Sequence, residues 1–228
     1  MAATNAIPRA DVRTGSYVTV VVGVLVLLAI YLHAFELRPR PFHFYPMIWI
    51  AVGLSVLWYV RPVTRDGGRD IGAAVLAAAY FAVLLVAGGV IGAGPALPFG
   101  PVAGSVEELY GLRIATDVPP GYGPALLYVG PYLRIGLIPY LLVGYLALAW
   151  LVYVIARSAR RAAAPGLIGI FACVGCTWPV LAAVLGGTGL VGSLGAAVYA
   201  NAYPISTAGF LLAVGLLWAI LHRYLPAT

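Results

Sequence analysis

The sequence predicts an all-α integral membrane protein with about six transmembrane helices, one of them kinked, and short interfacial helices. Hydrophobic residues make up 63% of the 228 residues and charged residues only 9%, and the mean hydropathy is +1.00. A soluble domain carries roughly 25% charged residues, so no water-soluble fold can bury this much apolar surface. The composition excludes cytosolic enzymes, nucleic-acid-binding modules and secreted disulfide scaffolds.

Six apolar runs are long enough to cross the membrane, since a hydrocarbon core about 30 Å thick needs roughly 20 helical residues. These runs are 16–35, 42–60, 71–94, 135–156, 166–186 and 205–221. No small-residue cleavage site follows the first run, so we expect a retained span rather than a signal peptide. Residues 1–228 are therefore predicted to form a single polytopic membrane domain.

The arginines predict the orientation of these spans. All thirteen basic residues are arginines, and nine of them fall on the same side as the N-terminus when the six runs are threaded in order. Basic residues concentrate in cytoplasmic loops. We therefore expect a multi-pass protein of the cell membrane, with both termini in the cytoplasm.

The segment 95–124 is the only substantial loop, and its six prolines argue against long helices. We expect it to be an ordered external loop. The apolar stretch that follows, 125–156, is too long for one span and is divided by Arg134. Residues 125–133 are expected to lie in the outer interface, with Arg134 reaching lipid headgroups as an anchor.

The sequence lacks the residues that several common chemical functions require. None of the seven acidic residues lies within a proposed span, whereas proton and cation transporters usually need an ionisable group at membrane depth. The phosphate-binding glycine loop, the GxSxG serine elbow and the HExxH zinc pair are also missing. These absences favour a protein that is not an enzyme.

The strongest chemical signal is the pair Cys173 and Cys176 in the predicted span 166–186. They are the only cysteines in the chain, and a spacing of three places them on one helix face. Pro179 lacks an amide hydrogen, so it leaves the Gly175 carbonyl without its helical donor. The sequence therefore predicts a helix kink at Pro179 beside the thiols.

Three interpretations of the cysteine pair stay open. The thiols are small apolar packing residues, or they cycle between dithiol and disulfide, or they hold a soft metal such as Cu(I). Bare thiolates are costly in lipid. A disulfide is neutral and a bound cation offsets the thiolate charge, so both active states are physically permissible.

His33 and His43 form a second candidate site. They flank a short predicted turn, 36–41, so the two imidazoles could face each other and bind haem or copper. The plainer interpretation is a pair of interfacial histidines that are hydrogen-bonded to Glu36, headgroups or water.

One resemblance to known proteins can be drawn from the fifth run. The stretch Phe171-Ala-Cys-Val-Gly-Cys-Thr-Trp-Pro-Val180, with its lysine-free surroundings, resembles small uncharacterised membrane proteins of haloarchaea. The resemblance implies an archaeal polytopic membrane protein associated with terminal oxidase biogenesis in the respiratory chain.

These observations lead to one functional hypothesis and two alternatives. The hypothesis is an accessory protein of a larger membrane complex that assists assembly or copper loading of a respiratory oxidase through Cys173 and Cys176. Cu(I) is the cofactor it implies, and its partners are the lipid bilayer and other membrane protein subunits, with no nucleic acid. The alternatives are a non-catalytic permease subunit of a transporter and a purely structural subunit of a membrane complex.

Overall fold

The computed structural model describes residues 9–36, 38–60, 71–94, 96, 110–116, 118–159 and 202–224. Within these residues the elements in chain order are α1 (Arg9–Ala34), α2 (Pro41–Tyr59), α3 (Ile71–Ala87), β1 (Ile91–Ala93), β2 (Gly111–Ala115), β3 (Ala125–Val129), β4 (Leu133–Leu137), α4 (Pro139–Ala159) and α8 (Ala202–Tyr224).

The helices lie where the apolar runs predict them. Three are long and apolar enough to cross a membrane, over Pro41–Tyr59 in α2, Pro139–Arg157 in α4 and Tyr203–Leu221 in α8. The apolar parts of α1 and α3 are shorter, at Val18–Ala34 and Ile71–Ala87. The predicted fifth span, 166–186, lies outside the described residues, so the number of six spans stays a prediction.

A four-stranded antiparallel sheet contradicts the all-α prediction. Its strand order is β1-β4-β3-β2. The segment 125–133, expected to be interfacial, holds β3, and the predicted loop 95–124 contributes β2. The physical reason is a tight turn: the backbone N–H of Gly130 donates to the carbonyl of Leu133 over 2.8 Å. This turn divides the apolar stretch into two runs of hairpin length.

Two of the predicted spans are shorter in the structure than in the prediction. The run 71–94 ends as a helix at Ala87, because Gly89 adopts a φ of +73°, a conformation that commonly ends helices. The chain then enters β1. The run 135–156 begins as strand β4 and turns helical only at Pro139, where a proline suits the first helical turn.

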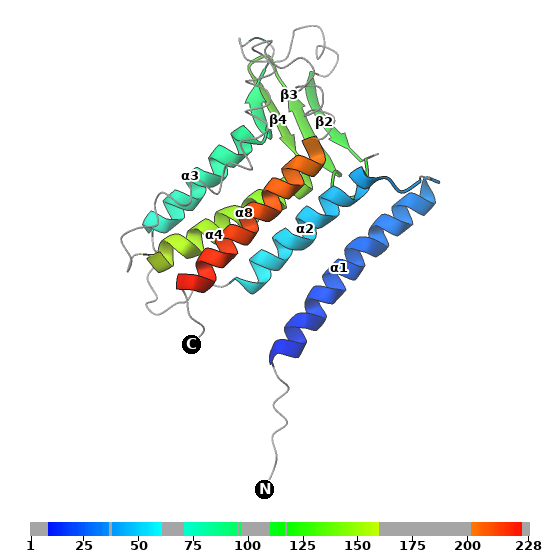
Figure 1. Ribbon diagram of the computed structural model, residues 1–228. Helices are drawn as coiled ribbons and strands as arrows, with labels where there is room; N and C mark the ends of the chain where they lie inside the picture. Colours follow the sequence, from blue (N-terminus) through cyan, green and yellow to red (C-terminus); the bar gives the residue numbers. More distant parts are fainter. Residues whose placement is uncertain are drawn as a thin grey trace.

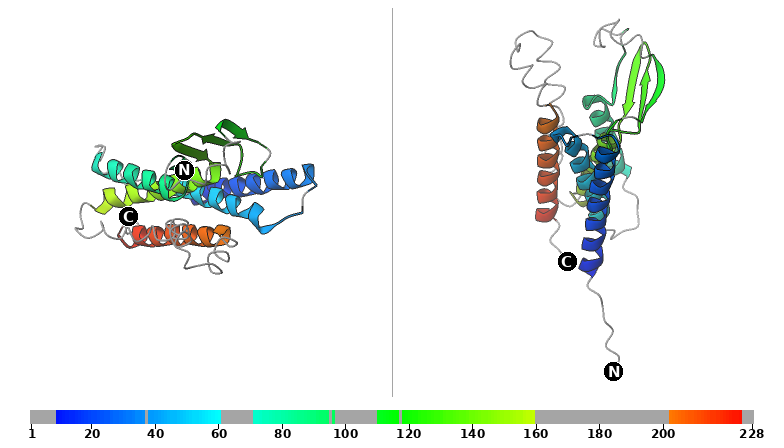
Figure 2. Two further views of the ribbon diagram at one scale, coloured as in Figure 1. Left: turned by 90° about the horizontal axis from the view of Figure 1, so that it is seen from above. Right: turned by 90° about the vertical axis from the view of Figure 1, so that its right-hand side faces the viewer.

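The helices form a bundle with the sheet at one end. Helix α4 packs against α2, α3 and α8, and it lies between α3 and α8 when the bundle is seen from above (Figure 2). Helix α1 packs beside α2 and stands apart from the rest (Figure 1). The start of α1 and the end of α8 lie at the end of the bundle opposite the sheet (Figure 1). We call these two ends the sheet end and the terminal end.

The core is centred on α4. Leu148, Leu151 and Val154 of this helix are completely buried, as is Phe210 of α8. A Cβ atom on Gly53 of α2 would lie 2.9 Å from Cγ1 of Val143 and 3.2 Å from its carbonyl oxygen. The missing side chain therefore lets α2 and α4 approach closely, which is how helices pack in lipid.

The end of α2 at the terminal end is also tied to α4. The indole N–H of Trp150 donates to the carbonyl of Val60 over 2.7 Å. Val60 directly follows α2, where carbonyl groups lack a helical donor, so the indole satisfies a group that the helix leaves unpaired.

Candidate functional site

Four of the predicted site residues lie outside the described part of the chain. They are Cys173, Gly175, Cys176 and Pro179. Their pairing, their metal and the helix kink therefore stay predictions. Of the remaining candidates, the structure describes His33, His43 and Arg134.

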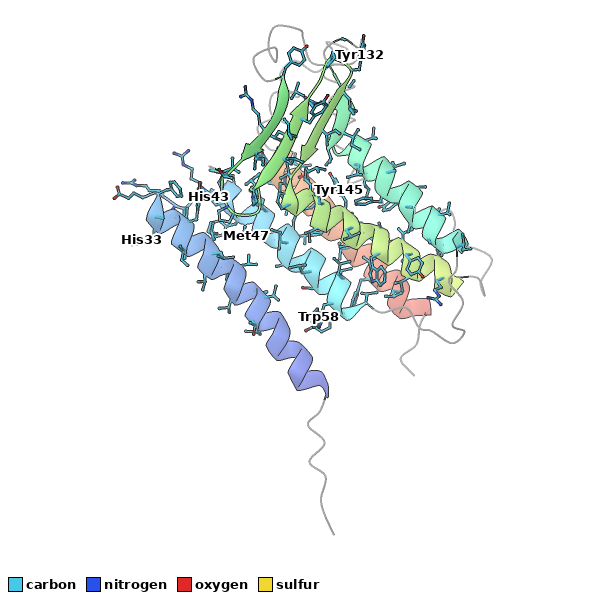
Figure 3. All side chains as sticks on the ribbon, turned by 180° about the vertical axis from the view of Figure 1, so that it is seen from behind. His33, His43, Met47, Trp58, Tyr132 and Tyr145 are labelled. Carbon is cyan, nitrogen blue, oxygen red and sulfur yellow. The ribbon has the colours of Figure 1, made fainter. Side chains whose placement is uncertain are left out.

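The two candidate histidines differ in burial. His33 is exposed near the end of α1, whereas His43 in the first turn of α2 is only 2% exposed. Both are labelled at the sheet end in Figure 3. The ring nitrogen Nδ1 of His43 lies 3.0 Å from the backbone nitrogen of Arg40 and 3.2 Å from its carbonyl oxygen. His43 thus closes the first turn of α2 in the manner of a capping box.

Arg134, predicted to divide the apolar stretch 125–156 and to anchor at lipid headgroups, lies in strand β4. A Cβ atom on Gly92 of the neighbouring β1 would lie 3.2 Å from its Nη2 atom, so the guanidinium extends across this glycine. Cross-strand partners share a sheet face. By register, Arg134 opposes Val129, and Arg113 opposes Leu127, which places both arginines on one face. A role in binding headgroups stays a prediction.

A proline inside α2 creates a polar site that the sequence did not reveal. Pro46 has no amide hydrogen, so the carbonyl of Phe42, four residues earlier, loses its helical donor. Pro46 is fully buried. The hydroxyl of Tyr122, from the segment between β2 and β3, donates to the Phe42 carbonyl over 3.3 Å. A group from the sheet end of the molecule therefore replaces the missing helix hydrogen bond.

Tyr122 also belongs to a cluster of four tyrosines from four parts of the chain. We call Tyr45, Tyr122, Tyr140 and Tyr203 the tyrosine cluster. The ring of Tyr122 meets Tyr140 edge-on with centroids 5.2 Å apart and Tyr203 edge-on at 6.0 Å, and Tyr45 stacks on Tyr203 at 6.5 Å. These are favourable aromatic geometries. The cluster joins α2, α4 and α8 to the segment between β2 and β3.

The environment of Tyr122 keeps its hydroxyl protonated. Burial raises the pKa of Tyr122 above its usual range, and the neighbouring hydroxyls of Tyr140 and Tyr203 and a hydrogen bond with Tyr203 raise it further. A neutral hydroxyl can donate to the Phe42 carbonyl. The backbone N–H of Tyr140 adds a hydrogen bond of 3.1 Å to the carbonyl of Gly121. The segment around Tyr122 is therefore attached to three helices.

Replacing Tyr122 with Phe is expected to lower the free energy of unfolding by about 0.5–1.5 kcal/mol, the net contribution of one hydrogen bond, because the Phe42 carbonyl loses its donor. Pro46→Ala supplies an amide hydrogen to the same carbonyl. In the Pro46→Ala protein, Tyr122→Phe should therefore lower the free energy of unfolding by less than half as much as it does in the wild-type protein. Unfolding of the four proteins in detergent micelles measures this coupling.

Tyr132→Phe is the control for this cycle, because Tyr132 is an exposed tyrosine in the turn between β3 and β4. Its loss should change stability by no more than about 0.5 kcal/mol. Equal costs of Tyr122→Phe with and without Pro46 would contradict the assignment of the Phe42 carbonyl as its partner.

The aromatic contacts continue from the tyrosine cluster to Trp49 in the bundle. Trp49 is 3% exposed. Its ring stacks on Phe210 with centroids 4.1 Å apart and meets Tyr140 and Tyr145 edge-on at 5.5 and 5.9 Å. Its indole N–H donates to the hydroxyl of Thr207 over 3.1 Å. Two polar groups in apolar surroundings thus satisfy each other, as burial requires.

Across the described segments, no group of three or more His, Cys, Asp or Glu side chains is placed to hold a metal ion. What the described residues do at the sheet end is positional: the hydroxyl of Tyr122 and the rings around it hold the sheet against the helices. Sequence reasoning missed this site. Pro46 could have indicated it, since a proline within an apolar run leaves the carbonyl four residues earlier without its helical donor. The sequence around Pro46 does not, however, identify Tyr122 as the residue that donates to this carbonyl.

Comparison with known proteins identifies a family whose function is unknown. No curated protein and no solved structure matches the chain. The model of one family of unknown function matches residues 1–223, which include all four strands and nearly all of the last described helix. The chain therefore belongs to DUF7546, a family of unknown function.

Proposed function

We propose that this protein is an accessory subunit of a larger membrane complex and that it crosses the cell membrane several times. Lipid contact is supported by outward-facing apolar side chains on three helices. These include Val22, Leu27 and Ile30 of α1, Val75 and Val86 of α3, and Leu212 and Leu216 of α8. Such surfaces suit hydrocarbon and not water.

The connectivity of the helices supports the proposed six spans. Helix α4 runs from the sheet end to the terminal end, and α8 begins again at the sheet end (Figure 1). A span at 166–186 would carry the chain back from the terminal end, where α4 ends, to the sheet end, where α8 begins. With the termini in the cytoplasm, as the arginine distribution predicts, the sheet would lie on the outer side of the membrane.

The observation that carries the proposal of a partner subunit is the exposed apolar face of the sheet. Leu112 and Ile114 of β2 are 64% and 65% exposed. They pair with Tyr128 and Leu126 of β3, so all four lie on the same face, the one opposite Arg113. We call these four residues the apolar sheet face.

Lipid would not cover the apolar sheet face. The sheet rises beyond the ends of the helices (Figure 1), where a bilayer that matches the helix length would have ended. Contiguous apolar surface in water marks an interaction site, and aromatic residues are enriched in protein interfaces. Another subunit of the complex is therefore the proposed occupant of this face.

The proposed activity of the complex remains the one that the sequence suggested. Cys173 and Cys176 would carry Cu(I) to a respiratory oxidase or support its assembly, with the sheet holding the partner. Purification from native membranes separates these two roles. Ile114→Glu places a charge on the apolar sheet face and is expected to release the partner, whereas Cys173→Ala and Cys176→Ala are expected to retain it and lose the bound copper and the oxidase activity.

The two cysteine variants also test whether the thiols act together. The double variant should lose no more activity than either single variant, because a two-ligand unit fails when one ligand is lost.

Tyr132→Glu, in the turn between β3 and β4 and outside the apolar sheet face, is the control and should keep both the partner and the bound copper. Wild-type partner binding in Ile114→Glu would contradict the accessory subunit. If both cysteine variants keep the wild-type copper content and oxidase activity, the copper role is wrong and the alternative of a purely structural subunit takes its place.

A further inference from the structure

Strand β2 forms one edge of the sheet. The strand order is β1-β4-β3-β2, and within the described residues no segment pairs with the outer side of β2. Its register with β3 runs without a bulge over all five residues, Gly111–Ala115. Every residue of β2 except Ala115 is exposed. An edge strand of this kind presents a row of backbone groups to any chain that can pair with it.

The turn between β3 and β4 fixes the direction of the backbone groups in β3. The backbone N–H of Gly130 donates to the carbonyl of Leu133, so these two residues form a hydrogen-bonded pair. Such pairs alternate with non-bonded pairs along an antiparallel ladder. Leu127 and Gly136, three positions further along, are therefore a non-bonded pair. The N–H of Gly136 accordingly donates to the carbonyl of Val90, on the other side of β4, and the backbone groups of Leu127 point to β2.

Two residues of β2 direct their backbone groups away from the sheet. Leu127 pairs with Arg113, so the backbone N–H and carbonyl of Arg113 point inward to β3. Alternation along the strand turns the backbone groups of Leu112 and Ile114 to the outer edge. Outside the sheet, no described residue makes a backbone hydrogen bond with either of them. Their side chains are 64% and 65% exposed, so the same two residues offer both backbone and apolar contacts.

A second copy of the chain fits this edge poorly. Two identical strands related by a two-fold axis would pair antiparallel, and the symmetric register that pairs all five residues centres on Arg113. That register places Arg113 opposite Arg113, and like charges directly opposite each other destabilise a sheet. The edge therefore fits a strand of different sequence. Such a strand would carry apolar side chains on the face shared with Leu112 and Ile114, and no basic side chain opposite Arg113.

We propose that the partner subunit adds an extended strand to the outer edge of β2. This mode of binding rests on the proposed function, since it describes how the partner on the apolar sheet face is held. Main-chain hydrogen bonds to Leu112 and Ile114 supply affinity in such complexes, and alternate side chains supply specificity. The added strand would extend the apolar sheet face. The opposite edge suits this less well, because β1 has only three residues and short edge strands resist pairing.

Hydrogen exchange of the full-length protein tests the added strand. In the isolated protein in detergent, the amides of Leu112 and Ile114 should exchange rapidly, whereas the amide of Arg113 is protected by β3. In the complex purified from native membranes, exchange at Leu112 and Ile114 should slow at least about tenfold. A bound partner with unchanged exchange at these two amides would overturn the added strand and leave the accessory subunit standing. Purification without any partner would overturn both proposals. A dimeric isolated protein in which both amides are already protected would identify a second copy instead, contrary to the proposal.

Ile114→Pro and Ile114→Ala separate the backbone contact from the side-chain contact. Proline removes the outward N–H and is tolerated in an edge strand, whereas alanine removes the side chain and keeps the N–H. Ile114→Pro should weaken partner binding at least about tenfold more than Ile114→Ala does. Ala93→Pro is the matched control in β1, where the N–H of Gly94 donates inward to Tyr132 and that of Ala93 points outward, and it should leave binding unchanged. Equal binding by the two Ile114 variants would contradict the backbone contact.

Discussion

Gly144→Ala is expected to destabilise the helix bundle by about 1–3 kcal/mol, the usual cost of forcing an extra carbon into a packed interior. A Cβ atom at this position would collide with Cε3 of Trp49 and lie 2.8 Å from Cζ3. The indole cannot move aside easily, because it stacks on Phe210 and donates a hydrogen bond to Thr207. Thermal unfolding of the detergent-solubilised protein measures the loss.

Gly215→Ala is the matched control for this substitution. Gly215 is an exposed glycine within α8, and a Cβ atom there would meet nothing within 4 Å. Alanine favours a helix over glycine by about 1 kcal/mol, so Gly215→Ala should leave the protein equally stable or slightly more stable. Similar effects of the two substitutions would show that helix propensity, and not contact with Trp49, decides the outcome at Gly144.

The positions of the helices could be predicted from the sequence because hydrophobic length decides them. Helices α1, α2 and α8 each overlap most of a predicted apolar run. In lipid every backbone polar group must be satisfied within the protein, so a long apolar run has few alternatives to a helix. Hydropathy alone therefore sufficed for these elements.

The sheet could not be predicted in the same way, because the strands are as apolar as a membrane span. Residues 125–137 form β3, a turn and β4, and hydropathy does not separate this hairpin from the start of a helix. The turn at Gly130 was the local signal. The outer strands depend on distant segments, since Ile91 of β1 pairs with Ile135 and Arg113 of β2 pairs with Leu127. Such pairings require the tertiary fold.

The candidate site was only partly accessible from the sequence for the same reason. His43 was singled out as a candidate ligand together with His33, but the structure buries the first and exposes the second. The donor to the Phe42 carbonyl comes from Tyr122, eighty residues away, and no local pattern identifies it.

Trp49→Ala is expected to be the most destabilising substitution in the described core, at about 3–5 kcal/mol, the range for removing a buried large aromatic side chain. Lipid is as apolar as the protein interior, so transfer from water contributes little, and helix association depends on packing and hydrogen bonds. Trp49 supplies both. Its removal takes away the stacking on Phe210, the edge contacts with Tyr140 and Tyr145, and the hydrogen bond to Thr207.

Trp58→Ala isolates this contribution, because Trp58 lies on the same helix but is 59% exposed (Figure 3). The two substitutions remove the same atoms and change the helix propensity of α2 equally. Trp58→Ala should therefore cost no more than about 1 kcal/mol in an unfolding experiment, with the intact fold confirmed by circular dichroism. Equal losses would mean that the exposed face of α2 packs as tightly as its buried face, and that Trp49 does not join α2 to α4 and α8.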